Sequence, residues 1–405
     1  MDILVVADGH YYIDPEKNVY VESVFDYSFY ARYLSAFDDV YAIIRAEKVE
    51  NVPKNCKLAS GKHVHFLPIP PTRGVKQYFK NYTRTKTIIE KYIKKFDMAI
   101  FRVPGVVSNL VSSIYMKTGK PFAIEVVVDP WEYFSKGTVR GITRPFIRLF
   151  WTMNLKNICK KANGVSYVTE YYLQKKYPCK AMMSKNKDYF TISYSSVELP
   201  DDQFGEPRKY KDKKKYIISH VANAFTGYGK GHITLMNAAK IVIERGYDIE
   251  VWFIGDGPLK KEFIEYSNKL GISKQIQFLG RMPSGAAVRD TIKKSDMFVF
   301  PTRAEGLPRV VLEAMAEGLP VISSPVCGIP EILPQECLVQ SDDYKGYADA
   351  IIYMINNPVL MNKYSINNIE KSKKYKSSIL NERRKNFYLL LRNCAKDGDK
   401  SYEHT

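Results

Sequence analysis

V-F-P-T-R-A-E-G-L-P-R-V-V-L-E-A-M-A-E-G-L-P-V-I-S-S-P-V-C-G-I-P-E-I-L-P, residues 299–334, is the stretch that decides the fold of this chain. The apolar residues 297–300 predict a buried parallel strand. Gly306 permits a sharp turn after it. Pro308 suits the first helical position, because the N–H there has no intrahelical partner, and Gly318 closes the helix. We therefore expect a strand, a glycine turn and a helix in close succession.

A helix that begins directly after a glycine turn offers free N–H groups and the positive end of its dipole to an anion. Glu305 lies in the expected loop and Glu313 inside the expected helix. Two carboxylates placed in this way suit the hydroxyl groups of a sugar and a ribose on either side of a phosphate. The spacing of the glutamates alone carries little information, since such pairs are common on solvated helices.

The ordered string resembles the E-x7-E signature of the retaining family-4 glycosyltransferases. Three upstream segments resemble further motifs of that family in the expected order, namely 229–232 (G-K-G-H), 251–259 (V-W-F-I-G-D-G-P-L) and 278–282 (F-L-G-R-M). The resemblance covers roughly residues 216–335. It implies an α/β fold of the GT-B type, with two doubly wound Rossmann-like domains that face a central cleft. The nucleotide-sugar donor would lie on the second domain and the acceptor on the first.

The resemblance also implies roles for individual residues. Lys230 matches a phosphate-binding lysine, Glu305 a ligand of the donor sugar, and Glu313 a ligand of the ribose. The backbone at the helix start would bind phosphate, and the loop after the 278–280 strand would hold the base. The expected donor site is therefore Gly9, Lys230, Gly280, Arg281, Met282, Glu305, Gly306, Leu307, Arg309, Val310 and Glu313.

One feature departs from the family pattern. The family often has an arginine a few residues before the lysine, whereas this chain has V-A-N-A-F-T-G-Y-G at 221–229. Arg309 or Arg303 could supply the missing cation. No D-x-D arrangement stands in a plausible loop, so we expect neither a metal nor another cofactor; the cations and N–H groups would stabilise the leaving diphosphate.

Two residues of the first half are candidates with two interpretations each. Gly9 either lets the backbone approach the cleft or is a simple glycine between a strand and a helix. Asp129 lies in an E-V-V-V-D-P-W-E segment, residues 125–132, that resembles part of some polysaccharide glycosyltransferases. We expect Asp129, with Glu305 and Lys230, to form the catalytic group, or else to cap a helix. No residue is expected to serve as a dedicated general base.

The pattern of apolar segments divides the chain. Residues 1–198 alternate short apolar runs with helical segments, which predicts a Rossmann-like first domain. A polar linker is expected at 199–214, and the donor domain at 215–365. Helices at 366–394 would cross back to the first domain, as the resemblance implies. Residues 395–405 are expected to be disordered.

Charge gives a further expectation. The net charge is +18, and residues 136–161 contain seven cations and no acid, with apolar residues between them. This pattern fits either an interfacial helix on anionic lipid or a core-packing helix with a basic edge. His63 and His65 fit a solvated strand face better than a metal pair. Scattered cysteines and the lack of a long apolar run favour the cytoplasm, at the inner face of the cell membrane.

The sequence thus predicts a retaining, metal-independent glycosyltransferase of cell-surface polysaccharide synthesis. Its expected partners are a nucleotide sugar, a glycan or polyprenyl-linked acceptor and an anionic membrane surface. Alternatives are another GT-B enzyme, such as an epimerase, or a basic nucleic-acid-binding protein. No nucleic-acid module is recognisable, so we do not expect nucleic acid as a partner.

Overall fold

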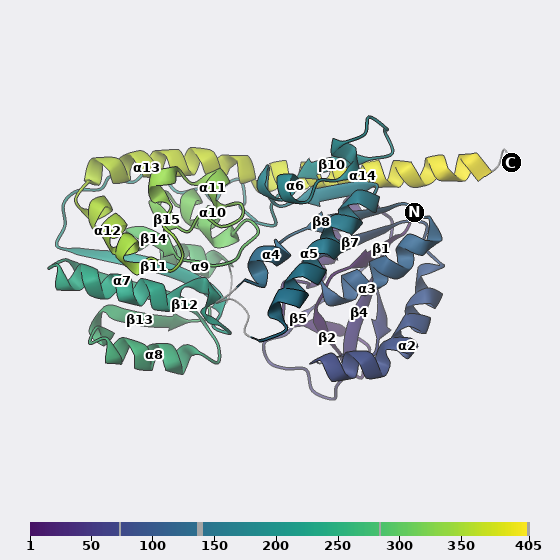
Figure 1. Cartoon of the computed structure of the whole chain (residues 1–405), viewed down its shortest axis with the longest axis horizontal. Helices are drawn as coiled ribbons and strands as arrows, with labels where there is room; N and C mark the ends of the chain where they lie inside the picture. Colours follow the sequence, from purple (N-terminus) through teal and green to yellow (C-terminus); the bar gives the residue numbers. More distant parts are fainter. Residues whose placement is uncertain (73, 136–140, 283–284, 403–405) are drawn as a thin grey trace.

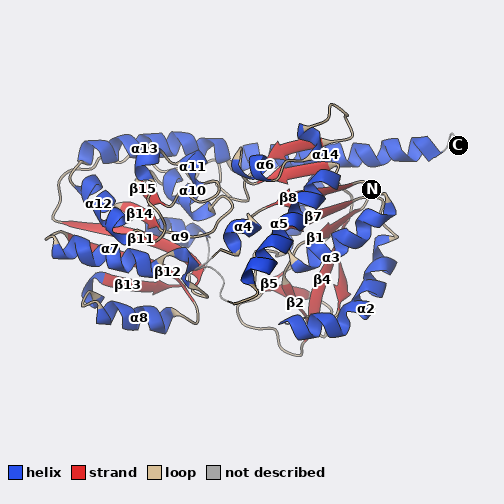
Figure 2. Ribbon diagram, in the orientation of Figure 1, coloured by secondary structure: helices blue, strands red, loops and turns tan. Residues whose placement is uncertain are grey.

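The chain forms two lobes joined side by side (Figures 1 and 2). A computed structural model describes residues 1–72, 74–135, 141–282 and 285–402. Lys136 and Arg140, two of the cations in the 136–161 stretch, lie outside the described residues. Each lobe is built around its own sheet, and the expected GT-B class of fold is confirmed.

The first sheet has ten strands within the described residues, in the order β10-β9-β8-β7-β1-β4-β2-β3-β5, with β6 also paired to β4. Its strands are β1 (Ile3–Val6), β2 (His10–Ile13), β3 (Val19–Val21), β4 (Val40–Lys48), β5 (Lys57–Leu58), β6 (Val64–Ile69), β7 (Ala99–Val103), β8 (Phe122–Val126), β9 (Gly164–Tyr167) and β10 (Phe190–Ser193). The central strands are parallel and apolar, because helices cover both of their faces.

Strands β2, β3 and β5 are an addition that the sequence did not predict. β2 and β3 pair antiparallel around a turn at residues 14–18, where the Asp14 side chain accepts from the backbone and the side chain of Asn18. β5 then pairs antiparallel with β3. The first sheet is therefore mixed rather than wholly parallel.

Helices of the first domain connect these strands. They are α1 (Tyr27–Ala31), α2 (Gly74–Ile93), α3 (Val106–Tyr115), α4 (Pro130–Tyr133), α5 (Arg144–Lys161) and α6 (Tyr172–Lys176), with short 3-10 turns η1 (Arg32–Ser35), η2 (Met116–Thr118) and η3 (Lys180–Met182).

The second sheet is wholly parallel, in the order β13-β12-β11-β14-β15. Its strands are β11 (Lys215–Ala224), β12 (Asp248–Asp256), β13 (Ile276–Gly280), β14 (Met297–Phe300) and β15 (Val321–Ser323). The helices are α7 (His232–Glu244), α8 (Lys260–Lys269), α9 (Gly285–Ile292), α10 (Arg309–Ala316), α11 (Ile329–Ile332), α12 (Tyr344–Ile355) and α13 (Pro358–Ser372), with 3-10 turns η4 (Tyr228–Lys230), η5 (Ser273–Gln275), η6 (Gln335–Cys337) and η7 (Lys373–Tyr375).

The decisive stretch folds as strand, turn and helix. β14 is fully buried, and α10 begins at Arg309 with Pro308 as its N-cap, one residue later than expected. Gly318 follows α10 in the left-handed conformation with φ +67°, and its N–H bonds to the Met315 carbonyl at 3.0 Å. A side chain at that position would be strained, so glycine ends the helix.

The segment expected as a linker has no regular structure but is held firmly on the second domain. Arg208 donates to the carbonyl oxygens of Lys293, Ser295 and Glu317 at 2.6–2.9 Å. The Gly205 N–H donates to the Ala316 carbonyl at the end of α10. These bonds satisfy four carbonyl groups of the second domain and hold the segment against it.

The last helix, α14 (Ser377–Tyr402), returns to the first domain (Figure 1). Its Tyr388 hydroxyl bonds to Glu125 of β8 at 3.0 Å, and Phe387 packs against Phe190 of β10. The helix continues past residue 394, where the sequence predicted disorder. Ala395 is buried against the first domain, so α14 still packs on the core one residue beyond the predicted boundary at residue 394. Residues 403–405 lie outside the described residues.

Candidate active site between the domains

The turn between β14 and α10 lies against the first domain. A Cβ on Gly306 would stand 2.0 Å from the Val127 carbonyl oxygen, which follows β8, and 3.0 Å from Val168 Cγ2, which follows β9. Only glycine allows this approach. The start of α10, with the N–H groups of Leu307, Arg309 and Val310, is thereby placed at the domain interface.

Lys230 and Glu305 meet at this turn. Gly231, with φ +79°, lets the chain pass beside Pro301, and the Arg303 N–H bonds to the Gly229 carbonyl at 2.8 Å. The Lys230 ammonium forms an ion pair with Glu305 Oε1. The two residues are 75 apart in the sequence, and the structure brings them together as the resemblance implied.

Thr302 also holds Glu305, through a hydrogen bond of 3.2 Å from its hydroxyl. Thr302 was not among the residues predicted from the sequence. Its position two residues after β14 was the available signal, because side chains at the carboxyl ends of parallel strands line the ligand sites of such sheets.

Glu313 lies in the second turn of α10 and is half-buried. Burial raises the pKa of its carboxyl above the ordinary value, and the positive charges of Arg309 and Arg289 oppose that shift. Within the described residues the carboxylate has no hydrogen-bond partner. A half-buried acceptor without a donor can take the hydroxyl groups of a ligand.

The three residues expected to grip the base lie at the end of β13. Gly280 has φ +77°, and Arg281 is exposed beside Asp256 at the end of β12. Hydrogen bonds from Lys260 and the Gly257 N–H hold the pKa of Asp256 below its usual value, with a contribution from Arg281. Met282 is half-buried near Thr291. The ends of β12 and β13 therefore form one polar surface next to the Lys230 loop.

A second contact between the domains was not predicted. The Glu331 carboxylate of α11 accepts the backbone N–H groups of Glu170, Tyr171 and Tyr172 at 2.6, 3.0 and 2.6 Å. These groups open α6 in the first domain, where a carboxylate is favoured by the helix dipole. The sequence places Glu331 in the G-I-P-E turn, but its partners lie about 160 residues away and leave no local signal.

Comparison with known proteins supports a class of enzyme. Residues 202–372 match the family described as "Glycosyl transferases group 1". Protein CapJ of Staphylococcus aureus is 28% identical over 376 residues, which cover 92% of this chain and 90% of the relative. The fold is similar to sucrose-phosphate synthase from Thermosynechococcus elongatus, with a TM-score of 0.67 and 16% identity over 97% of this chain and 99% of that one. This chain is a GT-B glycosyltransferase.

A second solved structure shows the same fold. The glycosyltransferase has a TM-score of 0.62 and 12% identity to Anabaena HepE, over 95% of this chain and 98% of that one, and HepE was solved in complex with UDP and glucose. The comparisons do not favour the two alternative functions that the sequence left open, another GT-B enzyme such as an epimerase and a nucleic-acid-binding protein.

Asp129 does not take the predicted role in the glycosyltransferase. It is fully buried and caps α4, where its Oδ1 accepts the Trp131 N–H at 2.8 Å. The Tyr172 hydroxyl and the Lys176 ammonium donate to Oδ2 at 3.0 and 2.6 Å, and the Tyr177 hydroxyl donates to Oδ1. Four donors occupy the carboxylate, so the capping interpretation is correct and no oxygen is left for an acceptor.

Gly9 also differs from both interpretations. It lies between β1 and β2, so no helix follows it. A Cβ there would come within 2.9 Å of the Tyr11 ring and 3.3 Å of the Phe25 ring. Glycine is required by packing inside the first domain rather than by a ligand.

The two histidines of the first domain and the possible metal ligands bear on the sequence prediction of a solvated strand face. His63 and His65 both contact Asp39 Oδ1, at 3.2 and 2.7 Å, on an exposed surface. Among the described residues no group of three or more His, Cys, Asp or Glu side chains could hold a metal ion. Metal independence itself stays a prediction.

Proposed function

We propose that this glycosyltransferase moves a sugar from a nucleoside-diphosphate sugar to a glycan or lipid-linked acceptor, with retention and without a metal. The observation that carries the proposal is the Lys230–Glu305 pair at the start of α10, pressed against the first domain by Gly306. A cation, a carboxylate and the free N–H groups at the start of α10 lie next to one another there.

Departure of the nucleoside diphosphate puts negative charge on the phosphates, and groups fixed in advance stabilise that charge best. Lys230 and the N–H groups of Leu307, Arg309 and Val310 supply this stabilisation in our proposal. Glu305 accepts from the hydroxyl groups of the donor sugar once Lys230 turns to phosphate. Glu313 accepts from the ribose, and Gly280 to Met282 hold the base.

Retention is proposed from the sequence resemblance. The sequence resemblance implies a front-face reaction, in which the leaving phosphate takes the proton of the acceptor hydroxyl. Asp129, the one carboxylate expected on the acceptor side, is occupied by four donors and cannot act as a base. The proposal therefore has no dedicated general base.

The acceptor belongs, in our proposal, to the synthesis of a cell-surface polysaccharide such as a capsule. Similarity to CapJ along nearly the whole chain, including the first domain, supports this. Similarity limited to the donor domain would not support a particular acceptor, because the acceptor is expected on the first domain.

Membrane contact at the inner face of the cell membrane is proposed for α5. Its first half exposes Phe146, Phe150 and Met153, which are 77, 63 and 60% accessible, while Leu155 and Ile158 in the second half are buried in the core. Arg148 stacks on Trp131 of α4 beside this apolar surface. Large exposed apolar side chains beside cations suit an anionic lipid interface. Within the described chain, every helix is too short or too polar to span a bilayer.

The central test is a panel of UDP-, GDP-, ADP- and CMP-sugars, read by thermal shift and by donor hydrolysis. We expect one nucleotide class to stabilise the protein and Lys230→Gln to abolish that effect. Hydrolysis should persist in EDTA, and the product anomer should match the donor. A protein that no nucleotide sugar stabilises would refute the proposal.

A further inference from the structure

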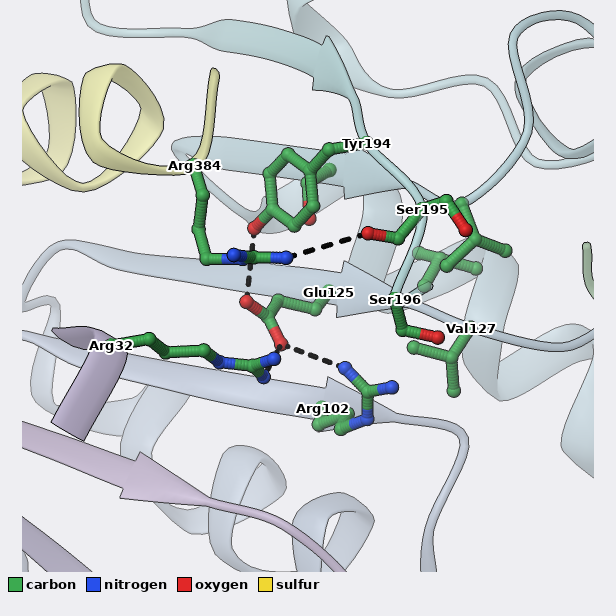
Figure 3. Close-up of a pocket in the computed structure, with 11 residues that line it drawn as sticks. Arg32, Arg102, Glu125, Val127, Tyr194, Ser195, Ser196 and Arg384 are labelled. Carbon is green, nitrogen blue, oxygen red and sulfur yellow. Dashed lines mark hydrogen bonds and ion pairs between the residues drawn. The ribbon is translucent and has the colours of Figure 1, made fainter. Parts of the chain in front are cut away.

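A cluster of three arginines surrounds one glutamate in the first domain (Figure 3). Glu125 of β8 is 1% exposed, and its Oε2 accepts from Arg102 of β7 at 3.1 Å and from Arg32 of η1 at 3.4 Å. Arg384 of α14 lies over the same carboxylate beside Tyr194. Three tyrosine hydroxyls also donate to Glu125, from Tyr33, Tyr194 and Tyr388.

The cluster holds more positive charge than it can neutralise. Among the described residues, Glu125 is the only carboxylate within ion-pair distance of any of the three arginines. The nearby guanidinium groups hold the pKa of Glu125 at about 2, against the effect of burial, so it is ionised at neutral pH. Three cations therefore face one anion, which leaves an excess of two charges.

This excess is not explained by folding. A buried charge is costly unless a counter-charge and hydrogen bonds compensate it. Nε of Arg32 and Nε of Arg384 are buried without a hydrogen-bond partner among the described residues. The terminal nitrogens of Arg32 also bond to Tyr33, and those of Arg384 bond to Asn381 and Ser195, but none of these three partners carries a negative charge. Arg102 donates to Glu125 alone among the described residues. One arginine would neutralise the charge of Glu125, so the two further cations point to an additional anion.

The space beside the cluster opens toward the donor domain. It is narrow and partly open to solvent, and Val127, Val168, Ser195 and Ser196 line it. Val127 and Val168 are the residues that Gly306 touches from the second domain. An anion in this space would therefore lie near the start of α10.

We propose that this pocket binds an oxyanion, a phosphate or a carboxylate, carried by the acceptor. Arg102 and Ser196 are its direct ligands, and Arg32 and Arg384 supply the charge behind them. The inference rests on the proposed function, because it identifies the acceptor of that same reaction. A guanidinium binds either oxyanion with two parallel hydrogen bonds, so both sources share one chemistry.

The test measures binding of inorganic phosphate by calorimetry, with chloride at equal ionic strength as reference. We expect Arg102→Gln to weaken phosphate binding about tenfold or more. Ser196→Asp places a carboxylate at the mouth of the pocket and should abolish binding without loss of thermal stability. The matched control is Arg245→Gln, an exposed arginine of the second domain that pairs with Asp349, and it should bind phosphate like the wild type.

Lys230→Gln separates this site from the donor site. Phosphate binding that depends on Arg102 and survives Lys230→Gln supports the pocket. Binding that is lost in Lys230→Gln and kept in Arg102→Gln and Ser196→Asp belongs to the donor phosphates and overturns the inference, while the proposed function stands. Wild-type protein without phosphate-specific binding also overturns it.

Competition then identifies the source of the anion. Glycerol phosphate and glucuronate are each titrated against bound phosphate, with glucose as the neutral reference. Displacement by glycerol phosphate indicates a phosphate-linked acceptor, and displacement by glucuronate an acidic sugar. Glucose that competes as well as both would contradict an oxyanion site.

Discussion

At the scale of single residues, the proposed donor site owes its features to charge and burial. Glu313 is kept half-buried without a hydrogen-bond partner among the described residues, and burial raises the pKa of its carboxyl. Such a group destabilises the free protein and is useful only when a ligand donates to it. Function and stability therefore conflict at this position.

Replacement of Glu313 by Gln tests that conflict. Because the folded-state pKa is raised, the contribution of the carboxyl to stability is lost as pH rises through that pKa. The variant should unfold less easily at neutral pH, by about 1 kcal/mol, because no charge is buried. Its donor affinity should fall. Calorimetry and thermal unfolding at pH 5 and pH 8 measure both, and a variant with weaker binding but no gain in stability at pH 8 would contradict the burial argument.

Arg309 is the better of the two candidates for the missing phosphate cation. It is exposed at the first position of α10, whereas Arg303 lies 3.9 Å from Asp342. We expect Arg309→Ala to weaken donor affinity about tenfold, the usual cost of a lost charged hydrogen bond. Arg303→Ala should bind the donor like the wild type. The reverse result would assign the role to Arg303, and full activity in both variants would remove both.

At the scale of secondary structure elements, two helices make contacts beyond their own domain. Helix α11 contacts the first domain, and α5 is proposed to contact the membrane. α11 bonds to α6 through Glu331, which satisfies three open N–H groups at a helix start. The contact fixes the spacing of the domains near Gly306. Its loss should favour an open arrangement.

Glu331→Gln should therefore open the two lobes. An amide oxygen can still accept but carries no charge, so the contact weakens by about 1–2 kcal/mol. We expect a larger radius of gyration by small-angle scattering and a lower kcat/KM, while affinity for the free nucleotide is kept. Glu370→Gln, at an exposed glutamate of α13 paired to Lys373, is the matched control. An unchanged scattering profile would show that other contacts hold the lobes together.

The exposed half of α5 should control membrane contact. Changing Phe146 and Phe150 to Ser removes the two most exposed aromatic side chains of the helix, which should reduce sedimentation with anionic vesicles about tenfold or more. Tyr353→Ser removes an exposed aromatic ring from α12 and should have no effect. Wild-type protein that does not sediment at physiological salt would end the membrane proposal.

At the scale of the whole molecule, buried titratable groups set the response to acid. Burial lowers the pKa of His220 to about 4 and of His232 to about 2. Both lie in the aromatic core of the second domain, where His232 stacks on Phe263. The unfolded chain takes up protons at about pH 6.5 that the folded chain refuses. Stability must therefore fall as pH drops below about 6.5.

His232→Phe should reduce this acid sensitivity. It keeps an aromatic ring against Phe263 and removes one group that must be held neutral. Between pH 7 and pH 5 the variant should lose about 2 kcal/mol less unfolding free energy than the wild type. Urea unfolding at the two pH values measures the difference, and equal losses would show that His232 is protonated or exposed in the folded protein.

The sequence by itself determined the second domain. A buried strand, a glycine turn and a helix are local patterns, so residues 297–318 predicted β14, the turn and α10 to within one residue. The resemblance of the motifs to the family pattern predicted that Lys230 and Glu305 belong to one site, and the two residues form an ion pair. The short apolar runs predicted within residues 1–198 likewise form strands of the first sheet, because a strand covered by helices on both faces is apolar throughout.

Only the tertiary structure decided what long-range contacts fix. Asp129 became a buried cap because Tyr172, Lys176 and Tyr177 fold back onto it, and its sequence motif does not show these donors. The three arginines around Glu125 come from β7, η1 and α14, which lie up to 352 residues apart, from Arg32 to Arg384. Electrostatic interactions depend on distance in space, so the excess charge of the first domain appears only when the chain is folded.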